Sequence, residues 1–357
     1  MKKKLFTILF ISLIDICSMY LFKNHSDIFF PMYRNISKNW ISFIAKLNSF
    51  TSVAVWDYGL FILIILFVLY IVYVFKNKKP IIKSLLNVVL VILIISSTTL
   101  YGWFLNHYSP KLYTYLDFEV EKYSVEQLYE TCEYYLLEAA KYSSLIDRDN
   151  EGHIIKYDFD EFANIAGKAY SSISNKYPIF EGANYKVKKI SLLGKYLMYN
   201  GISGMFMPVT GEAGVPEYIS DQWLAFDMAH EAAHRLGIAS EQEANFSAFL
   251  ACINNDDIRF KYTGYYCAFS YCLSSLLKED EKLALELYHK YDEDINVQYI
   301  QLDRHDSYLV YQQYESDLQD ISDKINDAYL KSFSQESGIK SYGEVTDYLI
   351  AYHLSII

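Results

Sequence analysis

Long apolar stretches fill much of the first hundred residues, and apolar positions at helical spacing recur through the rest of the chain. Residues 5–22, 58–75 and 84–105 are each long enough to cross a hydrocarbon core of about 30 Å as a helix. The first stretch holds one charged residue, Asp15, which we expect to face another helix or a water-filled gap. No small-x-small cleavage site follows this stretch, so we expect a multi-pass anchor and not a signal peptide.

The remaining sequence predicts a mostly helical domain. Ser124, with Gln127 three residues later, predicts a capping box and a helix that runs to about residue 142. Apolar spacing predicts further helices at about 158–176, 240–254, 257–277, 279–290, 308–333 and 341–356. The strand-like segments 201–207 and 214–219 flank a turn at 208–212 and predict a β-hairpin. The expected fold is therefore mainly α with a small hairpin or sheet, divided into an anchor (1–105) and a second domain (106–357).

Charge separates these two parts. Residues 1–110 hold 11 Lys and Arg against three acidic residues, and the remainder holds 21 against 40, a net charge of −19. The acidic second domain argues against nucleic acid as a partner. Residues 2–4 and the loop at 76–83 carry seven lysines, and the longer segment between the first two spans carries four basic residues. The positive-inside rule then predicts that the second domain is extracytoplasmic.

The sequence His230-Glu231-Ala232-Ala233-His234 is an HExxH motif. Residues four apart share one face of a helix, so two imidazoles at this spacing can bind one zinc ion from the same side. Glu231 would then lie beside the open position of the metal, where it can deprotonate a water molecule.

A sharp turn is expected directly after this motif. Gly237 is suited to end the helix, and Ser240 with Glu243 predicts a capping box for the next one. A carboxylate at the start of the new helix, Glu241 or Glu243, can therefore swing back toward the metal. A catalytic zinc takes three protein ligands and one open position, which either glutamate would complete.

Glu241, Ala244 and Asn245 form a Glu-x-x-Ala-Asn sequence that resembles the second motif of the glutamate zincins. The resemblance implies Glu241 as the third ligand and Asn245 as a side chain that holds a ligand in place from the same helix face. Glu243 stays the alternative. The metzincin pattern would put the third ligand at Ser240, an unsuitable residue, so that class is rejected.

The chain also resembles the bacterial DUF3810 family of membrane-anchored HExxH proteins. The resemblance covers most of residues 100–350 and is most specific in HEAAHRLGIASEQEANFSAFLAC at 230–252. Other matching segments are 103–108, 201–213 and 337–343. The resemblance implies a zincin-like domain behind three helices of a bacterial plasma membrane.

These patterns lead us to expect a membrane-anchored zinc metallopeptidase. His230, His234 and Glu241 would hold Zn²⁺, and Glu231 would move the proton. The expected partners are the lipid bilayer and a peptide or protein substrate, which would pair with segment 201–207 by β-addition. The alternative is a non-catalytic zinc-binding membrane sensor or scaffold, in which the metal serves stability.

Three other polar residues are weaker candidates. The position of Glu212 directly after Gly211 favours a turn residue, and a cleft carboxylate is the alternative. Tyr342 and His353 are candidates to stabilise an oxyanion only by their residue type, and His107 is expected to be an unrelated surface or interface residue.

Overall fold

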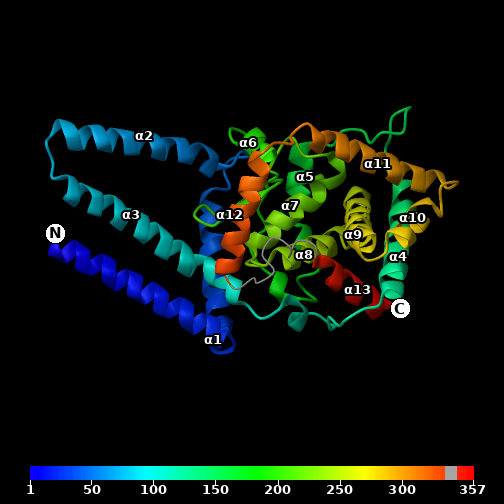
Figure 1. The fold of residues 1–357 in the computed structure, drawn as a ribbon, viewed down its shortest axis with the longest axis horizontal. Helices are drawn as coiled ribbons and strands as arrows, with labels where there is room; N and C mark the ends of the chain where they lie inside the picture. The colour runs from blue at the N-terminus through cyan, green and yellow to red at the C-terminus, as the bar shows by residue number, and fades with distance from the viewer. Residues whose placement is uncertain (334–343) are drawn as a thin grey trace.

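Three apolar helices extend to one side of a helical body in the computed structural model, which describes residues 1–333 and 344–357 (Figure 1). The apolar helices are α1 (Lys2–Leu47), α2 (Val55–Lys76) and α3 (Ile81–Gly102). The helices of the body are α4 (Val125–Ser143), α5 (Phe159–Ala166), α6 (Gly194–Tyr199), α7 (Asp221–Arg235), α8 (Glu241–Ile253), α9 (Ile258–Glu279), α10 (Glu281–His289), α11 (Ile295–Gln312), α12 (Leu318–Ser332) and α13 (Val345–Ile356). Its strands are β1 (Lys188–Ile190), β2 (Met205–Met207) and β3 (Glu212–Pro216).

Within the described residues, α1, α2 and α3 are each long and apolar enough to cross a membrane. The prediction of a mainly helical chain with three apolar N-terminal helices and a small sheet is therefore confirmed. Asp15 of α1 accepts a hydrogen bond from Ser97 Oγ of α3 at 2.6 Å, so it faces another helix as expected. The last span ends at Gly102 instead of residue 105.

α1 continues well beyond its predicted span. The backbone leaves helical geometry at His25, and Pro31 lies inside the helix, so the second half turns away from the first (Figure 1). This second half packs on α3 and on the body: Ser37 Oγ donates to the carbonyl of Gly102, the last residue of α3, at 2.7 Å. Arg34 Nη2 donates to the Ile179 carbonyl of the body at 2.7 Å. Contacts thus cross the expected domain division after residue 105, which stays a prediction.

Two buried carboxylates join α2 to the body: one belongs to α2 and accepts hydrogen bonds from the body, and the other belongs to the body and accepts hydrogen bonds from α2. Asp57 of α2 accepts the backbone N–H groups of residues 191–193 at 2.6–3.0 Å. Glu212 of β3 accepts the N–H groups of Val55 and Trp56, at the start of α2, at 3.0–3.2 Å. Glu212 is therefore the acceptor for the first turn of an apolar helix.

Replacing Asp57 by Ala is expected to lower the melting temperature of the full chain by about 5–10 °C, since it leaves three N–H groups without their acceptor and costs about 2–3 kcal/mol. Thermal unfolding in detergent measures the change. Asp27→Ala removes an exposed carboxylate of α1 and is the matched control. Equal melting temperatures for the two variants would contradict the bracing role of Asp57.

The sheet has the strand order β1-β3-β2. β2 and β3 pair antiparallel, with Phe206 opposite Ala213, so the predicted hairpin is confirmed with slightly different bounds. The turn between them contains Gly211 at φ 67°, where the backbone lies against Ala45 of α1. β1, which pairs parallel with β3, was not predicted because its three residues are too few to show a pattern.

Several helices match the sequence predictions, and two do not. The capping box of α4 at Ser124 and Gln127 is confirmed. The prediction of a helix over 158–176 is wrong, because α5 ends at Ala166. The next residue, Gly167, lies directly against the Tyr185 carbonyl. The helix expected at 308–333 is also wrong: α11 ends at Gln312, and the chain turns before α12, where Ser316 Oγ donates to the Tyr199 carbonyl.

Candidate metal centre

The HExxH motif lies on the last turns of α7, buried in the body. Gly237, at φ 87°, ends this helix and donates its N–H to the His234 carbonyl at 2.9 Å, so the predicted turn is confirmed. α8 begins after Ser240 as expected, but the predicted capping box is wrong. The Ser240 side chain makes no capping bond, and the Glu243 carboxylate is held by other donors.

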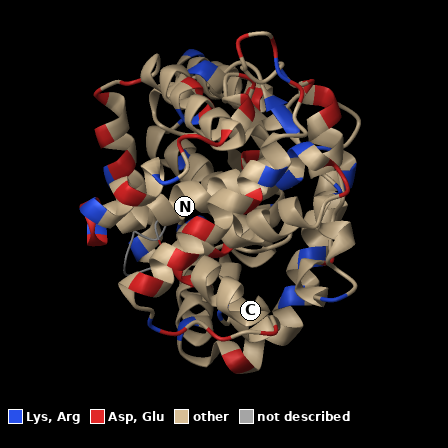
Figure 2. Cartoon of the chain, turned by 90° about the vertical axis from the view of Figure 1, so that its right-hand side faces the viewer, with Lys and Arg blue, Asp and Glu red and all other residues tan. Residues whose placement is uncertain are grey.

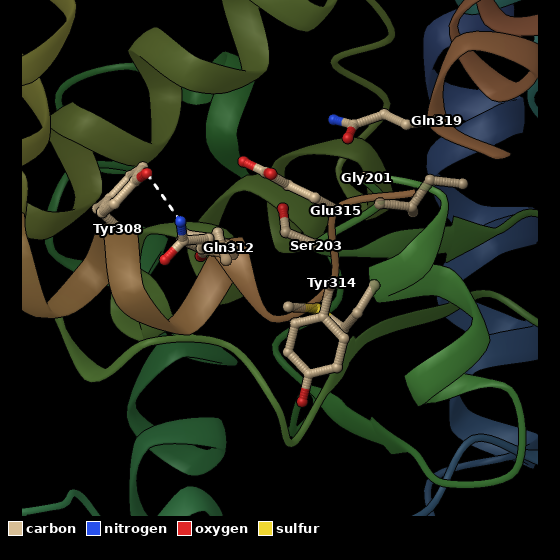
Figure 3. Close-up of a pocket in the computed structure, with 10 residues that line it drawn as sticks. Gly201, Ser203, Tyr308, Gln312, Tyr314, Glu315 and Gln319 are labelled. Carbon is tan, nitrogen blue, oxygen red and sulfur yellow. Dashed lines mark hydrogen bonds between the residues drawn. The ribbon is translucent and has the colours of Figure 1, made fainter. Parts of the chain in front are cut away.

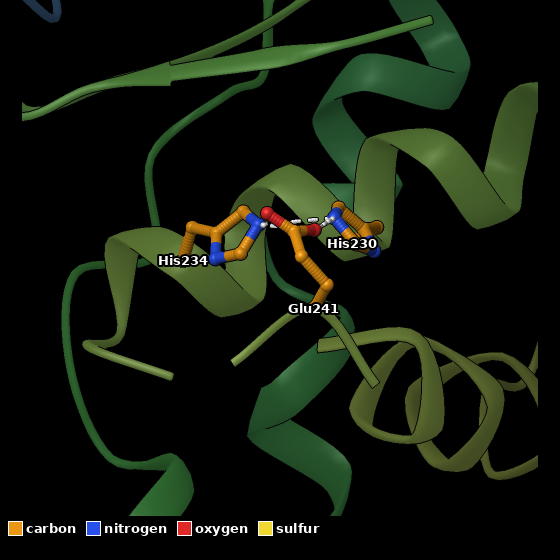
Figure 4. A group of neighbouring side chains, drawn as sticks. All are labelled: His230, His234 and Glu241. Carbon is orange, nitrogen blue, oxygen red and sulfur yellow. Dashed lines mark hydrogen bonds and ion pairs between the residues drawn. The ribbon is translucent and has the colours of Figure 1, made fainter. Parts of the chain in front are cut away.

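The turn brings the side chains of His230, His234 and Glu241 together (Figure 4). Nε2 of His230 lies 3.0 Å from Nε2 of His234. Oε2 of Glu241 lies 3.2 Å from the first of these nitrogens and 3.4 Å from the second. Three donor atoms from two helices therefore form a nearly equilateral triangle.

The triangle fits a tetrahedral zinc ion. Zinc binds imidazole nitrogen and carboxylate oxygen at about 2.0–2.2 Å, so tetrahedral ligands lie about 3.3–3.5 Å apart. The observed edges of 3.0–3.4 Å are close to this spacing. That these side chains hold a metal stays a prediction, and the donor chemistry and spacing agree with it.

Both imidazoles are oriented by a hydrogen bond at their other nitrogen. Nδ1 of His230 contacts Oδ1 of Asn245 at 2.7 Å, and Nδ1 of His234 contacts the Ile238 carbonyl at 2.7 Å. Acceptors at Nδ1 leave the Nε2 lone pairs directed at the shared point, which is the usual arrangement behind metal-binding histidines. Asn245 thus stands where the sequence comparison with the glutamate zincins implies.

Replacing Asn245 by Ala is expected to weaken zinc affinity about 10- to 100-fold, because His230 loses the acceptor that fixes its ring. Competition with a fluorescent chelator measures the affinity. Asn254→Ala, at the far end of α8, is the control and should bind zinc like the wild type. Wild-type affinity in the Asn245 variant would show that this contact does not orient a ligand.

The Glu231 side chain extends from α7 toward the segment that leads into β2. Gly204 is so close that a Cβ at this position would collide with the Glu231 carboxylate, so only glycine allows this approach. Oε2 of Glu231 is buried and has no hydrogen-bond partner among the described residues. A carboxylate oxygen buried without a partner is costly, and it suits a group that meets a water or substrate atom.

Burial and mutual charge shift the pKa values of these groups. Burial raises the pKa of Glu231 to about 8, and the carboxylates of Glu241 and Asp227 act in the same direction. Burial alone would lower the pKa of His234, but the Glu241 carboxylate outweighs it and raises this pKa to about 9. The two imidazoles hold the pKa of Glu241 well below its usual range, against the effect of burial. The cluster thus places an anionic carboxylate where a cation would bind.

The other candidates lie elsewhere. Glu243 Oε1 accepts hydrogen bonds from the Leu112 N–H and the Tyr348 hydroxyl, each at 2.9 Å, so its carboxylate is committed to joining α8, α13 and the segment after α3. His353 hydrogen-bonds Thr131 of α4 and stacks on Tyr134. Tyr342 lies outside the described residues.

Three residues beside the cluster were missed as functional candidates. Trp103, the first residue after α3, donates its indole N–H to the His234 carbonyl at 2.8 Å. His107 Nε2 lies 2.9 Å from the Tyr329 hydroxyl of α12, and its pKa is lowered to about 3 by burial and by the nearby His234. Burial raises the pKa of Tyr329, and the nearby Glu241 carboxylate raises it further. His107 is therefore a neighbour of the cluster and not an unrelated residue.

Fold and cluster together define a mainly helical protein with three apolar N-terminal helices and a buried His-His-Glu group that could hold a metal ion. A family model described as "Protein of unknown function (DUF3810)" matches residues 32–350. The chain therefore belongs to this family. No curated protein and no solved structure matches the chain.

Proposed function

We propose that the protein is a membrane-anchored zinc metallopeptidase. The observation that carries the proposal is the convergence of three donor atoms, from His230, His234 and Glu241, beside the partnerless oxygen of Glu231. Three protein ligands are the number expected of a catalytic zinc, whereas structural zinc sites take four. Zn²⁺ bound there would supply Lewis-acid chemistry, polarising a carbonyl oxygen and making a water molecule more acidic.

Glu231 is the proton carrier in this proposal. In the ionised form, which the charge of a bound cation would favour, its buried oxygen would accept a proton from the attacking water and later deliver it to the leaving amine. The close approach of Gly204 fixes the position of the carboxylate against the strand segment.

β2 would bind the substrate backbone. It is the outer strand of the sheet on the side next to Glu231, and within the described chain no other strand pairs with its free edge. An extended peptide can add to such an edge through main-chain hydrogen bonds, which would bring a scissile bond close to Glu231.

The proposed location is the bacterial plasma membrane, with the body on the extracytoplasmic side. The lysines of residues 2–4 and 76–83 lie at the ends of the apolar helices away from the body, which the positive-inside rule assigns to the cytoplasm. The contact between Trp103, which follows α3, and His234 would hold the metal centre near the membrane surface.

The test uses the full chain in detergent or nanodiscs, stripped of metal and reloaded with Zn²⁺. A library of fluorogenic and unlabelled peptides is incubated with each form, and products are identified by mass spectrometry. We expect cleavage by the zinc-loaded protein only, with loss after chelation. A protein that binds one zinc ion per chain and cleaves no peptide would overturn the peptidase proposal.

The burial of the cluster favours a second candidate function. His230, Glu231 and His234 are only 5–9% exposed, and the Glu241 side chain is 14% exposed. A buried zinc ion can serve stability alone in a membrane sensor or scaffold. That function predicts a large drop in melting temperature on chelation with no turnover of any peptide.

A further inference from the structure

A pocket of about 230 Å³ is lined by Gly201, Ile202 and Ser203, directly before the glycine that touches Glu231 (Figure 3). It lies between the segment before β2, the end of α11 and the start of α12. The volume is below the roughly 300–1,000 Å³ of sites for whole small molecules. It therefore suits one side chain of a larger substrate.

The lining of the pocket includes three tyrosines and one carboxylate. Tyr308, Tyr311 and Tyr314 line it, and the Glu315 carboxylate extends across it above Ser203 (Figure 3). Among the described lining residues none is Lys, Arg or His. Tyrosine rings attract cations through their faces, and an ionised carboxylate pairs with ammonium or guanidinium groups.

A second carboxylate lies behind the Ser203 wall. Asp227, one turn before Glu231 on α7, is held close to Ser203 and Tyr311. Its Oδ2 is buried and has no hydrogen-bond partner in the part of the chain that the structure describes. Burial raises the pKa of Asp227 to about 7, as expected for a carboxyl group that lacks a neighbouring cation.

The segment before β2 connects the pocket to the candidate metal centre. Ser203 lines the pocket, and the next residue, Gly204, touches Glu231. α12 lies along both, since Gln319 lines the pocket and Tyr329 lies near Glu241. Ten residues of helix span about 15 Å, or about four residues of an extended peptide.

We propose that this pocket is a subsite for a basic side chain, Lys or Arg, of the peptide substrate, within about four residues of the scissile bond. The inference rests on the proposed peptidase function and names its substrate class. The aliphatic stem would lie between the tyrosine rings, and the charged head would meet Glu315, with the field of Asp227 behind Ser203. Acidic residues are spread over the body, whose segment 111–357 has a net charge of −19, and this field would attract cationic peptides (Figure 2).

The first experiment measures binding without turnover. The full chain carrying Glu231→Gln is placed in phosphatidylcholine nanodiscs, and N-acetylated, C-amidated alanine hexapeptides with one Lys, Arg or norleucine at each position are titrated by calorimetry. We expect the best Lys or Arg peptide to bind about tenfold more tightly than its norleucine counterpart. Adding Glu315→Gln should remove most of this preference, and Asp320→Asn, an exposed change of equal charge on α12, should preserve it.

Equal affinity for Lys and norleucine peptides, or a Lys preference that survives in Glu315→Gln, would overturn the subsite. Asp227→Asn adds a second readout, because a smaller Lys preference in this variant supports the role of the buried carboxylate. Glu315 is exposed, so the Glu315→Gln variant is expected to fold like the wild type.

Wild-type cleavage separates the two proposals. A Lys preference in binding without any cleavage would keep the subsite and overturn the peptidase. Cleavage of basic and neutral peptides with equal kcat/KM would keep the peptidase and overturn the subsite.

Discussion

The Glu231→Gln variant is expected to lose peptide cleavage, with kcat lower by about 10²–10⁴-fold, and still to bind one zinc ion per chain. Glutamine has nearly the same shape as glutamate, so it fits the space between α7 and Gly204. It cannot accept the proton of the attacking water. Zinc should remain because Glu231 is not one of the three converging donors. Initial rates with a fluorogenic peptide and metal analysis of the same sample measure both quantities.

Glu293→Gln is the matched control, since it removes the same charge from an exposed position distant from α7 in sequence. Its rate and zinc content should equal those of the wild type. Cleavage that survives in Glu231→Gln at full zinc occupancy would contradict the proposed proton carrier. Loss of zinc together with activity would instead assign Glu231 to the binding of the metal.

Local sequence patterns predicted much of the fold, but they did not predict where α5 ends or where the chain turns before α12. The apolar helices, the capping box at Ser124 and the hairpin around Gly211 each depend on a few neighbouring residues, so they are visible in the sequence. The end of α5 depends on the Tyr185 carbonyl against Gly167, a contact between segments that the sequence does not bring together. The same holds for the turn before α12, where Ser316 binds the Tyr199 carbonyl.

The candidate site divides in the same way. His230, His234 and Glu241 are eleven positions apart at most, joined by one turn that Gly237 makes predictable. Trp103, which binds the His234 carbonyl, and Tyr329, beside His107, come from distant parts of the chain. Only folding places them at the cluster, so spacing arguments could not find them.

These distant contacts make the apolar helices part of the site. Trp103 follows α3 directly, and the second half of α1 packs against the turn at Gly237 through Arg34. A fragment that begins at residue 106 would lack both contacts. Measurements of metal binding and cleavage therefore belong to the full chain in a membrane mimetic.

The choice of the third ligand leads to the second large effect. Glu241→Ala is expected to abolish tight zinc binding, since it removes one of three donors, whereas Glu243→Ala should keep the zinc. Zinc that binds only the folded state at 100 to 1,000 times its Kd stabilises a protein by about 2.7–4.1 kcal/mol. The wild type and Glu243→Ala should therefore gain melting temperature when zinc is added, and Glu241→Ala should not.

Stability without metal shows why both variants are needed. Glu243→Ala leaves the Leu112 N–H and the Tyr348 hydroxyl without their buried acceptor, which costs about 1–3 kcal/mol for each group. Its melting temperature should fall even in the metal-free protein, so a low melting temperature alone does not identify a ligand. The increase in melting temperature on adding zinc does identify a ligand. Each variant is compared with its own metal-free form, so the structural cost is the same in both measurements. A full increase in Glu241→Ala and none in Glu243→Ala would assign the third ligand to Glu243 and require α8 to rotate when the metal binds.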